Sequence, residues 1–174
     1  RYTREWYLDR VARIRQAMPD CAITTDIIAG FCGETEQDHQ DTLDIMRRVK
    51  YDYAYMFQYS ERPGTLAARK YPDDIEPQEK TRRLNEIIAL QNELSLESNK
   101  KDVGKVLTVL VEGTSKRSDK ELCGRASNNK MCVFPAELAE ASEPTTPGRY
   151  HVGDYVKVEV LSCTSATLIC KISE

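Results

Sequence analysis

Two glycine-containing loops carry the residues of this chain whose types and spacing could support chemistry. The first follows an apolar run and reads Gly30-Phe-Cys-Gly33-Glu-Thr35. Glycine adopts backbone angles that other residues avoid and lets a ligand approach the main chain, and amide groups at a helix start favour an anion. The loop lacks the Lys-Ser/Thr pair of a P-loop and the third glycine of a dinucleotide-binding fold. By spacing alone it is equally consistent with an anion site and with an ordinary strand-to-helix turn.

The second loop follows another apolar run and reads Ser60-Glu-Arg62-Pro-Gly-Thr65. Pro63-Gly64 predicts a turn, and Arg62 offers a planar guanidinium suited to a carboxylate or a phosphate. Functional groups gather at the carboxyl ends of strands in open α/β sheets and in barrels. Because each loop follows a predicted strand, the sequence predicts a site where the two loops meet.

Six cysteines raise the alternatives of a disulfide framework and a metal site; they are Cys21, Cys32, Cys123, Cys132, Cys163 and Cys170. No two are separated by two or three residues, so zinc-binding and iron–sulfur spacings are both missing. Cys132, Cys163 and Cys170 lie within apolar runs, where free cysteine behaves as a small hydrophobe. We expect reduced thiols in a cytosolic protein, and no metal or cluster bound by this chain.

A strand–helix–strand unit is predicted to position both loops. Its strands are the apolar run from Ile23 to Ala29 and the run from about Tyr53 to Tyr59. The helix between them begins near Thr35 with a capping-box pattern to Asp38. Its apolar stripe is His39, Leu43, Met46 and Val49. Near-continuous apolar runs are typical of parallel strands buried on both faces.

Two further helices are predicted on either side of this unit. The first covers residues 3–18, with Thr3 as its cap and apolar residues at helical spacing. The second begins after Asp73 to Pro77, where a proline early in the first turn favours helix initiation, and continues to about Lys101.

The composition changes after Asp102, where short alternating apolar runs separated by glycines begin. These runs are Leu107 to Val111, Met131 to Phe134, Val156 to Val160 and Leu168 to Ile172. The pattern predicts a small antiparallel barrel, the class that includes oligonucleotide-binding folds. Residues 136–149 are predicted to be a loop without a site.

The charge pattern leaves nucleic-acid binding to a local patch, because the net charge is only −3. Five basic residues against two acidic ones lie between Lys116 and Lys130. Charge alone does not separate a solvated basic loop from an RNA contact. Phe134 could stack a base, although an aromatic residue in a small barrel more often lies in the core.

No membrane or secretory segment is apparent. The apolar runs all fall short of the roughly 20 residues that a membrane helix needs. The charged start, Arg1 to Glu5, also lacks the apolar core of a signal peptide. We therefore expect a cytoplasmic protein without a membrane partner.

Several of these motifs together carry a family resemblance. The segments Asp26 to Glu36 and Tyr55 to Thr65, with Leu90-Gln91, resemble the radical S-adenosylmethionine methylthiotransferases. The closing barrel, with Gly124-Arg125, Asn129 and Val133-Phe134, resembles the TRAM domain of that family, an RNA-binding module. The Ser-x-Arg-Pro-Gly-Thr form resembles the bacterial branch that adds a methylthio group to isopentenyl-adenosine beside the anticodon of tRNA. The relative that modifies a ribosomal protein differs after the second strand.

The resemblance implies an α/β plus all-β fold in two domains. Residues 1–102 would be the end of a partial (β/α) barrel, its last βαβ unit and helices, together with the long linking helix. Residues 103–174 would be a small antiparallel TRAM barrel. Cys32 stands where the family usually has proline.

The resemblance also implies the cofactors S-adenosylmethionine and two [4Fe-4S] clusters in the full-length enzyme. The cysteines that hold those clusters, including a CxxxCxxC loop, are absent from this chain. We therefore expect no catalytic residue and no metal ligand here, and we expect the fragment alone to be inactive.

By position in the resembled family, three groups of residues are candidate contacts. Ile28, Gly30, Met56 and Phe57 would contact the cofactor S-adenosylmethionine as apolar walls and close backbone, although buried strand residues need no ligand. Arg62 and Thr65 would lie near the substrate nucleotide. The anticodon stem-loop of tRNA would be bound through Lys116, Arg117, Arg125, Asn129 and Lys130.

Two other functions are consistent with the sequence: a stand-alone RNA-binding adaptor, and a methylthiotransferase acting on another tRNA or on a ribosomal protein. An open face distinguishes a fragment from a stand-alone adaptor. A lone βαβ pair leaves strand edges and an apolar face uncovered, which is a liability for a finished protein. We therefore expect the isolated fragment to homodimerise or aggregate through Ile27, Ala29, Tyr55 and Phe57.

Overall fold

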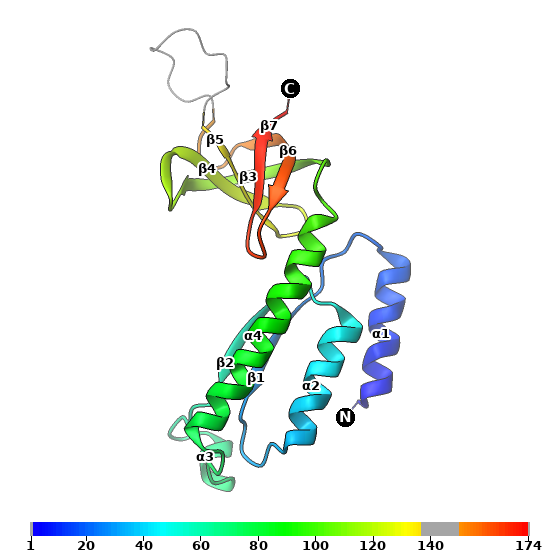
Figure 1. The fold of residues 1–174 in the computed structure, drawn as a ribbon, viewed down its shortest axis with the longest axis vertical. Helices are drawn as coiled ribbons and strands as arrows, with labels where there is room; N and C mark the ends of the chain where they lie inside the picture. The colour runs from blue at the N-terminus through cyan, green and yellow to red at the C-terminus, as the bar shows by residue number, and fades with distance from the viewer. Residues whose placement is uncertain (1, 137–149, 174) are drawn as a thin grey trace. The chain divides into compact units, whose positions relative to one another are not determined.

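The computed structural model describes residues 2–136 and 150–173 (Figure 1). It divides into two compact units, Arg1–Ser95 and Leu96–Glu174. Apart from residue 136, the loop predicted at 136–149 lies outside the described residues.

The first unit is built around a pair of parallel strands. Its elements are α1 (Arg4–Ala17), β1 (Thr24–Ala29), α2 (Glu36–Val49), β2 (Tyr53–Gln58), a short helix α3 (Leu66–Lys70) and most of α4 (Pro77–Lys100). Strands β1 and β2 pair from Thr24 opposite Tyr53 to Ala29 opposite Gln58. This pairing confirms the predicted strand–helix–strand unit, whereas α3 was not predicted.

Side-chain caps fix two of these helices at the predicted residues. Thr3 accepts a hydrogen bond from the Trp6 amide at the start of α1, and Thr35 and Asp38 form a capping box at the start of α2. Trp6, the single tryptophan of the chain, is 47% exposed and lies under the Arg10 guanidinium, 4.9 Å from the ring centre.

Helices α1, α2 and α4 contribute to one apolar core with the covered face of the strands. Its buried members are Val11, Ala29, Leu43, Met46, Val49, Tyr51, Ile87 and Leu94. Gln91 of α4 donates hydrogen bonds to the Tyr51 carbonyl and to Ser95 Oγ, each 2.9 Å long, within this core. His39, predicted as part of the apolar stripe, is fully buried and pairs with Glu86 at 2.8 Å.

The other face of the strand pair is exposed, and its residues differ from the prediction at Ile27 and Ala29. Ile28, Tyr55 and Phe57 are each 55% exposed and Tyr53 is 48% exposed; these four residues are called the open face. Ile27 and Ala29, predicted to lie on it, instead pack into the helical core. The reason is that strand side chains alternate between faces, and the register sets Ile28, not Ile27, opposite Phe57.

The second unit contains a closed barrel of five strands in the order β3-β4-β5-β7-β6. They are β3 (Val106–Ser115), β4 (Ser118–Ala126), β5 (Met131–Pro135), β6 (Tyr155–Cys163) and β7 (Leu168–Ile172). The β5–β7 pair is parallel and the other pairs are antiparallel. The predicted antiparallel barrel is therefore wrong at this one strand pair. An odd number of strands in a ring cannot alternate direction throughout, which makes a parallel pair unavoidable.

The barrel core is filled by the apolar residues that the alternating pattern predicted. Val109, Val111, Val156, Val158 and Val160 are buried with Leu168 and two cysteines, Cys132 and Cys170. Phe134 is only 1% exposed. Phe134 is thus a core residue, and its alternative role as a base-stacking side chain is excluded in this fold. The basic residues of the predicted loop lie largely on strand β4 and its flanking turns.

The open face predicts that the isolated chain associates with itself. Burying four large apolar side chains is favourable, so we expect dimers or larger species by sedimentation velocity. Tyr55→Lys combined with Phe57→Lys should restore the monomer, because two lysines facing each other cannot pack there. Leu66→Lys, at a residue of α3 that is 59% exposed, is the matched control and should leave association unchanged. An unmodified chain that stays monomeric at high concentration would contradict the prediction.

Candidate cofactor-facing strand ends and nucleic-acid interface

Gly30 ends strand β1 under two separate constraints. Its φ angle is +74°, in the left-handed region that disfavours other residues. A Cβ atom added there would lie 2.4 Å from Cγ of Lys80. The Gly30 amide donates a 2.6 Å hydrogen bond to the Glu34 carboxylate. The close approach at this glycine is therefore made by a side chain of α4.

Lys80 joins the carboxyl ends of both strands to the segment before α4. Its side chain is 6% exposed, and its ammonium lies 2.5 and 2.6 Å from the two Asp73 oxygens. The same ammonium lies 5.3 Å from the ring centre of Tyr59, which follows β2. A buried ammonium needs such partners because desolvating an unpaired charge is costly. Lys80 thus fixes the spacing between the first loop and the end of β2.

Arg83, one turn further along α4, holds the first loop from the side. Its guanidinium donates to the Glu34 carbonyl at 2.8 Å and to the Glu34 carboxylate at 2.9 Å. It also donates to Glu79 at 2.9 Å. Hydrogen bonds from Arg82, and then from Arg83, lower the pKa of the Glu79 carboxyl to about 2. The Gly30–Thr35 loop is therefore anchored by fixed charges.

The predicted cofactor and substrate residues fall into different environments. Ile28 and Phe57 are register partners on the open face near the ends of their strands, whereas Met56 points to the opposite face and packs against the core. Thr65 caps α3, accepting from the Ala68 amide and donating to the Arg62 carbonyl at 2.9 Å. The structure brings Ile28 and Phe57 together; the ligand roles of all these residues stay predictions.

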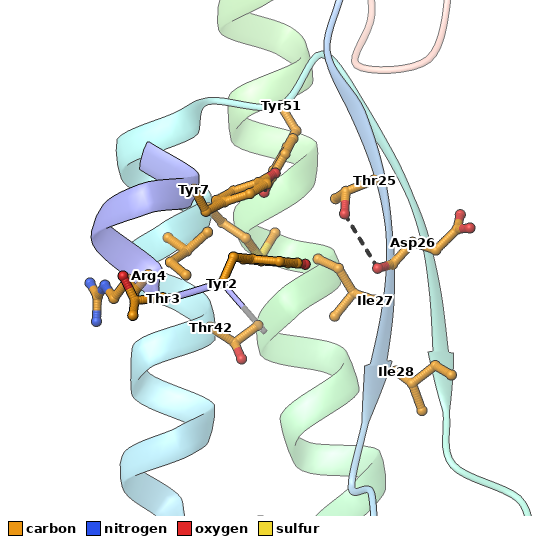
Figure 2. Close-up of a pocket in the computed structure, with 12 residues that line it drawn as sticks. Tyr2, Thr3, Arg4, Tyr7, Thr25, Asp26, Ile27, Ile28, Thr42 and Tyr51 are labelled. Atoms are coloured by element: carbon orange, nitrogen blue, oxygen red, sulfur yellow. Dashed lines mark hydrogen bonds between the residues drawn. The ribbon is translucent and has the colours of Figure 1, made fainter. Parts of the chain in front are cut away.

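A pocket of about 490 Å³ lies on the side of β1 that faces away from β2 (Figure 2). It is lined by residues of α1, β1 and α2 and by the residues that flank these helices, and the rings of Tyr2, Tyr7 and Tyr51 gather opposite Ile27. The Tyr7 and Tyr51 hydroxyls lie 2.6 Å apart, and burial raises the pKa of Tyr51. Of the predicted cofactor residues, Ile28 alone lines it. The pocket therefore follows the free edge of β1.

The predicted RNA-binding residues divide into three places on the barrel unit. Lys116 and Arg117 lie in the turn between β3 and β4. Arg125 lies near the far end of β4 and donates to the Asn129 carbonyl at 3.0 Å, so these two residues meet. The seven residue steps from Ser118 to Arg125 correspond to roughly 20 Å of strand. One patch therefore cannot include both groups at contact distance.

Lys130 is committed to a structural contact. Its side chain is 12% exposed and donates to the Asp102 carboxylate at 2.7 Å and to the Ser98 carbonyl at 3.0 Å. Burial by itself raises the pKa of Asp102, but hydrogen bonds from Lys130 and Lys105 outweigh it and leave that pKa below its ordinary value. Lys130 thus anchors the turn after β4, and its RNA role stays a prediction.

Neither a metal site nor a membrane span is found in the described part of the chain. In residues 2–136 and 150–173, no group of three or more His, Cys, Asp or Glu residues could hold a metal ion. Within the same ranges, no helix is long and apolar enough to cross a membrane.

The barrel unit matches a known family, the TRAM domain, over residues 100–172. The chain is therefore a protein that contains a TRAM domain. A curated relative from Phocaeicola vulgatus is 52% identical over 168 residues, which are 97% of this chain and 34% of the relative. Its name is tRNA-2-methylthio-N(6)-dimethylallyladenosine synthase.

Relatives with the same name come from Parabacteroides distasonis, 52% identical over 97% of this chain, and Porphyromonas gingivalis, 50% identical over 99%. The chain spans about a third of the length of these relatives, 34% and 35%, respectively. Over nearly its whole length it is homologous to the C-terminal portion of the MiaB-type tRNA methylthiotransferases, which confirms the family indicated by the motifs.

Two residues that organise the strand ends, Lys80 and Arg83, were missed by the sequence reasoning. Both lie in the long helix, where charges of both signs are mixed, a pattern that is typical of a solvated outer face. The available signal was the helical period, because Lys80, Arg83 and Ile87 share one side of the helix, and all three are buried. A charged residue on the apolar side of a helix is typical of a buried ion pair.

Gly30→Ala should destabilise the first unit by about 2–5 kcal/mol, the sum of left-handed backbone strain and overpacking against Lys80. Gly33→Ala is the matched control: its φ angle is +76°, but a Cβ there meets open space. Strain alone should cost about 1–2 kcal/mol at Gly33. Denaturant unfolding followed by helical circular dichroism measures the free energy of unfolding of both variants. Equal losses of stability would show that the Lys80 side chain moves aside without an energetic cost.

Proposed function

We propose that this chain is the C-terminal, RNA-binding portion of a tRNA methylthiotransferase that adds a methylthio group to N6-dimethylallyladenosine beside the anticodon. The observation that carries the proposal is 52% identity over 97% of the chain to a synthase of that name. The TRAM match over residues 100–172 supports RNA contact. In this proposal the longer protein acts on tRNA in the cytoplasm.

The first domain, assigned here to residues 1–102, would supply the last strands of a partial (β/α) barrel. The support is the covered and open faces of the β1–β2 pair, together with the pocket along the free edge of β1. A two-stranded sheet is marginal by itself. A preceding strand of the longer protein would occupy that edge, and the open face would line the barrel interior.

S-adenosylmethionine fits the ends of these strands. Ile28 and Phe57 present apolar, half-exposed side chains one residue before the ends of β1 and β2, where barrels carry their ligands. They would form an apolar wall, while Lys80 and Arg83 hold the adjoining loop. When bound, the cofactor supplies the radical chemistry. The iron–sulfur clusters do not fit the described residues of this chain, which include no group of three or more His, Cys, Asp or Glu residues that could hold a metal ion.

The second domain, assigned to residues 103–174, would bind the anticodon stem-loop. Lys116, Arg117 and Arg125 are solvent-accessible cations on one hairpin, and Asn129 lies beside Arg125. Phosphate contacts by such residues position RNA without reading its sequence. The base to be modified would then be selected by the first domain, at the strand ends near Arg62 and Thr65.

A chimera tests the enzymatic part of the proposal. The matching portion of the Phocaeicola vulgatus relative is replaced by this chain, and methylthio-adenosine in tRNA is quantified by mass spectrometry. We expect modified tRNA. The same chimera with Phe57→Asp should lose at least about tenfold in product, because a charge would be buried in the barrel interior. A chimera that binds tRNA yet makes no product would contradict the proposed activity.

Charge reversal tests the RNA contact on the chain itself. Lys116→Glu with Arg117→Glu should weaken stem-loop binding and reduce the slope of log Kd against log salt by about two, one for each lost phosphate contact. Lys171→Glu makes the same kind of charge change where the lysine pairs with Glu159 at 2.9 Å, and serves as the control. Equal slopes for the double variant and the original chain would place the phosphate contacts elsewhere.

A further inference from the structure

The most exposed aromatic side chain described in the barrel unit is Tyr155, at the start of β6. It is 71% exposed, whereas Phe134 is 1% exposed. Tyr155 lies on the outer face of the barrel, because its neighbour Val156 is buried in the core and strand side chains alternate. A largely solvated ring on a sheet loses most of the hydrophobic energy that burial would provide, so packing of the barrel itself does not explain this tyrosine.

The strand register sets Tyr155 in a row with a cation. Leu110 of β3 lies opposite Tyr155 on one side and opposite Arg125 of β4 on the other. Directly opposed side chains lie about 4.5–5.5 Å apart between Cβ atoms. The adjoining row of Val156, Val109 and Ala126 is buried. In this outer row the half-buried Leu110 lies in the middle, with the exposed ring of Tyr155 at one end and the guanidinium of Arg125 at the other.

Cations flank the ring on this face. Arg125, 41% exposed, is held in place by the Asn129 carbonyl at 3.0 Å and by Glu112 at 3.5 Å. Lys157 follows Tyr155 by two positions, so it projects from the same face, and it is exposed and lies opposite Thr108. The carboxylates nearby in sequence already have partners. Asp154 accepts a hydrogen bond from the His151 amide, Glu112 pairs with Arg125, and Glu159, two positions beyond Lys157, pairs with Lys171.

An exposed ring with two cations on the same face of the barrel suits a nucleobase attached to phosphates. Aromatic side chains stack on unpaired bases of any type, and neighbouring Arg or Lys residues contact the backbone. A protein partner would need a larger apolar area than Tyr155 and Leu110 offer. Double-stranded RNA keeps its bases stacked inside the helix and offers none to the ring.

We propose that Tyr155, with Arg125 and Lys157, forms a stacking platform that takes one unpaired base of RNA. The platform rests on the proposed RNA binding and adds to it the residue that contacts a base. Its sequence preference is weak, because every base has a stacking face.

The experiment measures binding of the whole chain to an anticodon stem-loop RNA carrying 2-aminopurine in the loop, and to a blunt duplex of the stem alone. Tyr155→Leu should weaken stem-loop binding by about 5- to 150-fold, the range for loss of one base–aromatic stack. Tyr155→Phe keeps the ring and should bind like the original chain. Leu161→Ala, at an apolar residue of the same strand that is 49% exposed, is the control for general loss of apolar surface.

Two further readouts separate stacking from charge. The salt slope of Tyr155→Leu should match that of the original chain, because a stacked base releases no counterions. Duplex binding should be unaffected. The 2-aminopurine emission change on binding should be lost in Tyr155→Leu and kept in Tyr155→Phe.

The outcomes distinguish this inference from the proposed function. If the original chain binds neither RNA, the proposed RNA binding itself fails. If the original chain binds the stem-loop and Tyr155→Leu binds equally well, RNA binding stands and the platform is overturned. An equal loss of duplex and stem-loop binding would also overturn it, because a duplex presents no unpaired base.

Discussion

Two buried cations at the start of one helix determine the arrangement of the strand ends. Lys80 and Arg83 are withdrawn from water, and each must be matched by carboxylates and carbonyls. Those partners come from the segment before α4 and from the loop after β1, so pairing the charges also fixes both backbones. Removing Lys80 would deprive Asp73 of its cation, and removing Arg83 would leave the Glu34 carboxylate with the Gly30 amide but without a cation. The conformation of Gly30 follows from the same packing, because the Lys80 stem occupies the volume that a Cβ would need.

The sequence predicted those features that depend on local chemistry. The capping box of Thr35 and Asp38, the parallel pair β1–β2 and the alternating core valines of the barrel all follow from short-range patterns. Of the four residues predicted for the open face, Tyr55 and Phe57 are exposed, whereas Ile27 and Ala29 are wrong. An apolar run such as Ile27-Ile28-Ala29 does not indicate which of its members turns inward. The register against β2, a long-range property, decides this. Lys80 and Arg83 were missed for a related reason: their burial depends on loops far away in sequence.

The two units differ in how completely their strands are paired with neighbours and covered on both faces. The barrel closes on itself, so its strands all find neighbours, and its odd strand count is accommodated by one parallel pair. The β1–β2 sheet has a core on one face only and leaves four large apolar side chains on the other. The five-stranded barrel closes within this chain, and the contrast supports the proposal that the β1–β2 sheet is part of a larger barrel. The same contrast separates the two chemistries proposed here: solvated cations and a tyrosine for RNA on the barrel, and apolar walls for a cofactor on the sheet.

The position of Trp6 gives the two units different optical properties. It is the only tryptophan of the chain and lies on α1 in the first unit, half-exposed beneath Arg10. Its emission therefore responds to loss of the α1 packing. It does not report unfolding of the barrel, whose chromophores are tyrosine and phenylalanine. A native chain thus carries a built-in reporter of one unit alone. Any difference between its fluorescence transition and the transition seen by strand circular dichroism would measure directly how far the two units unfold independently.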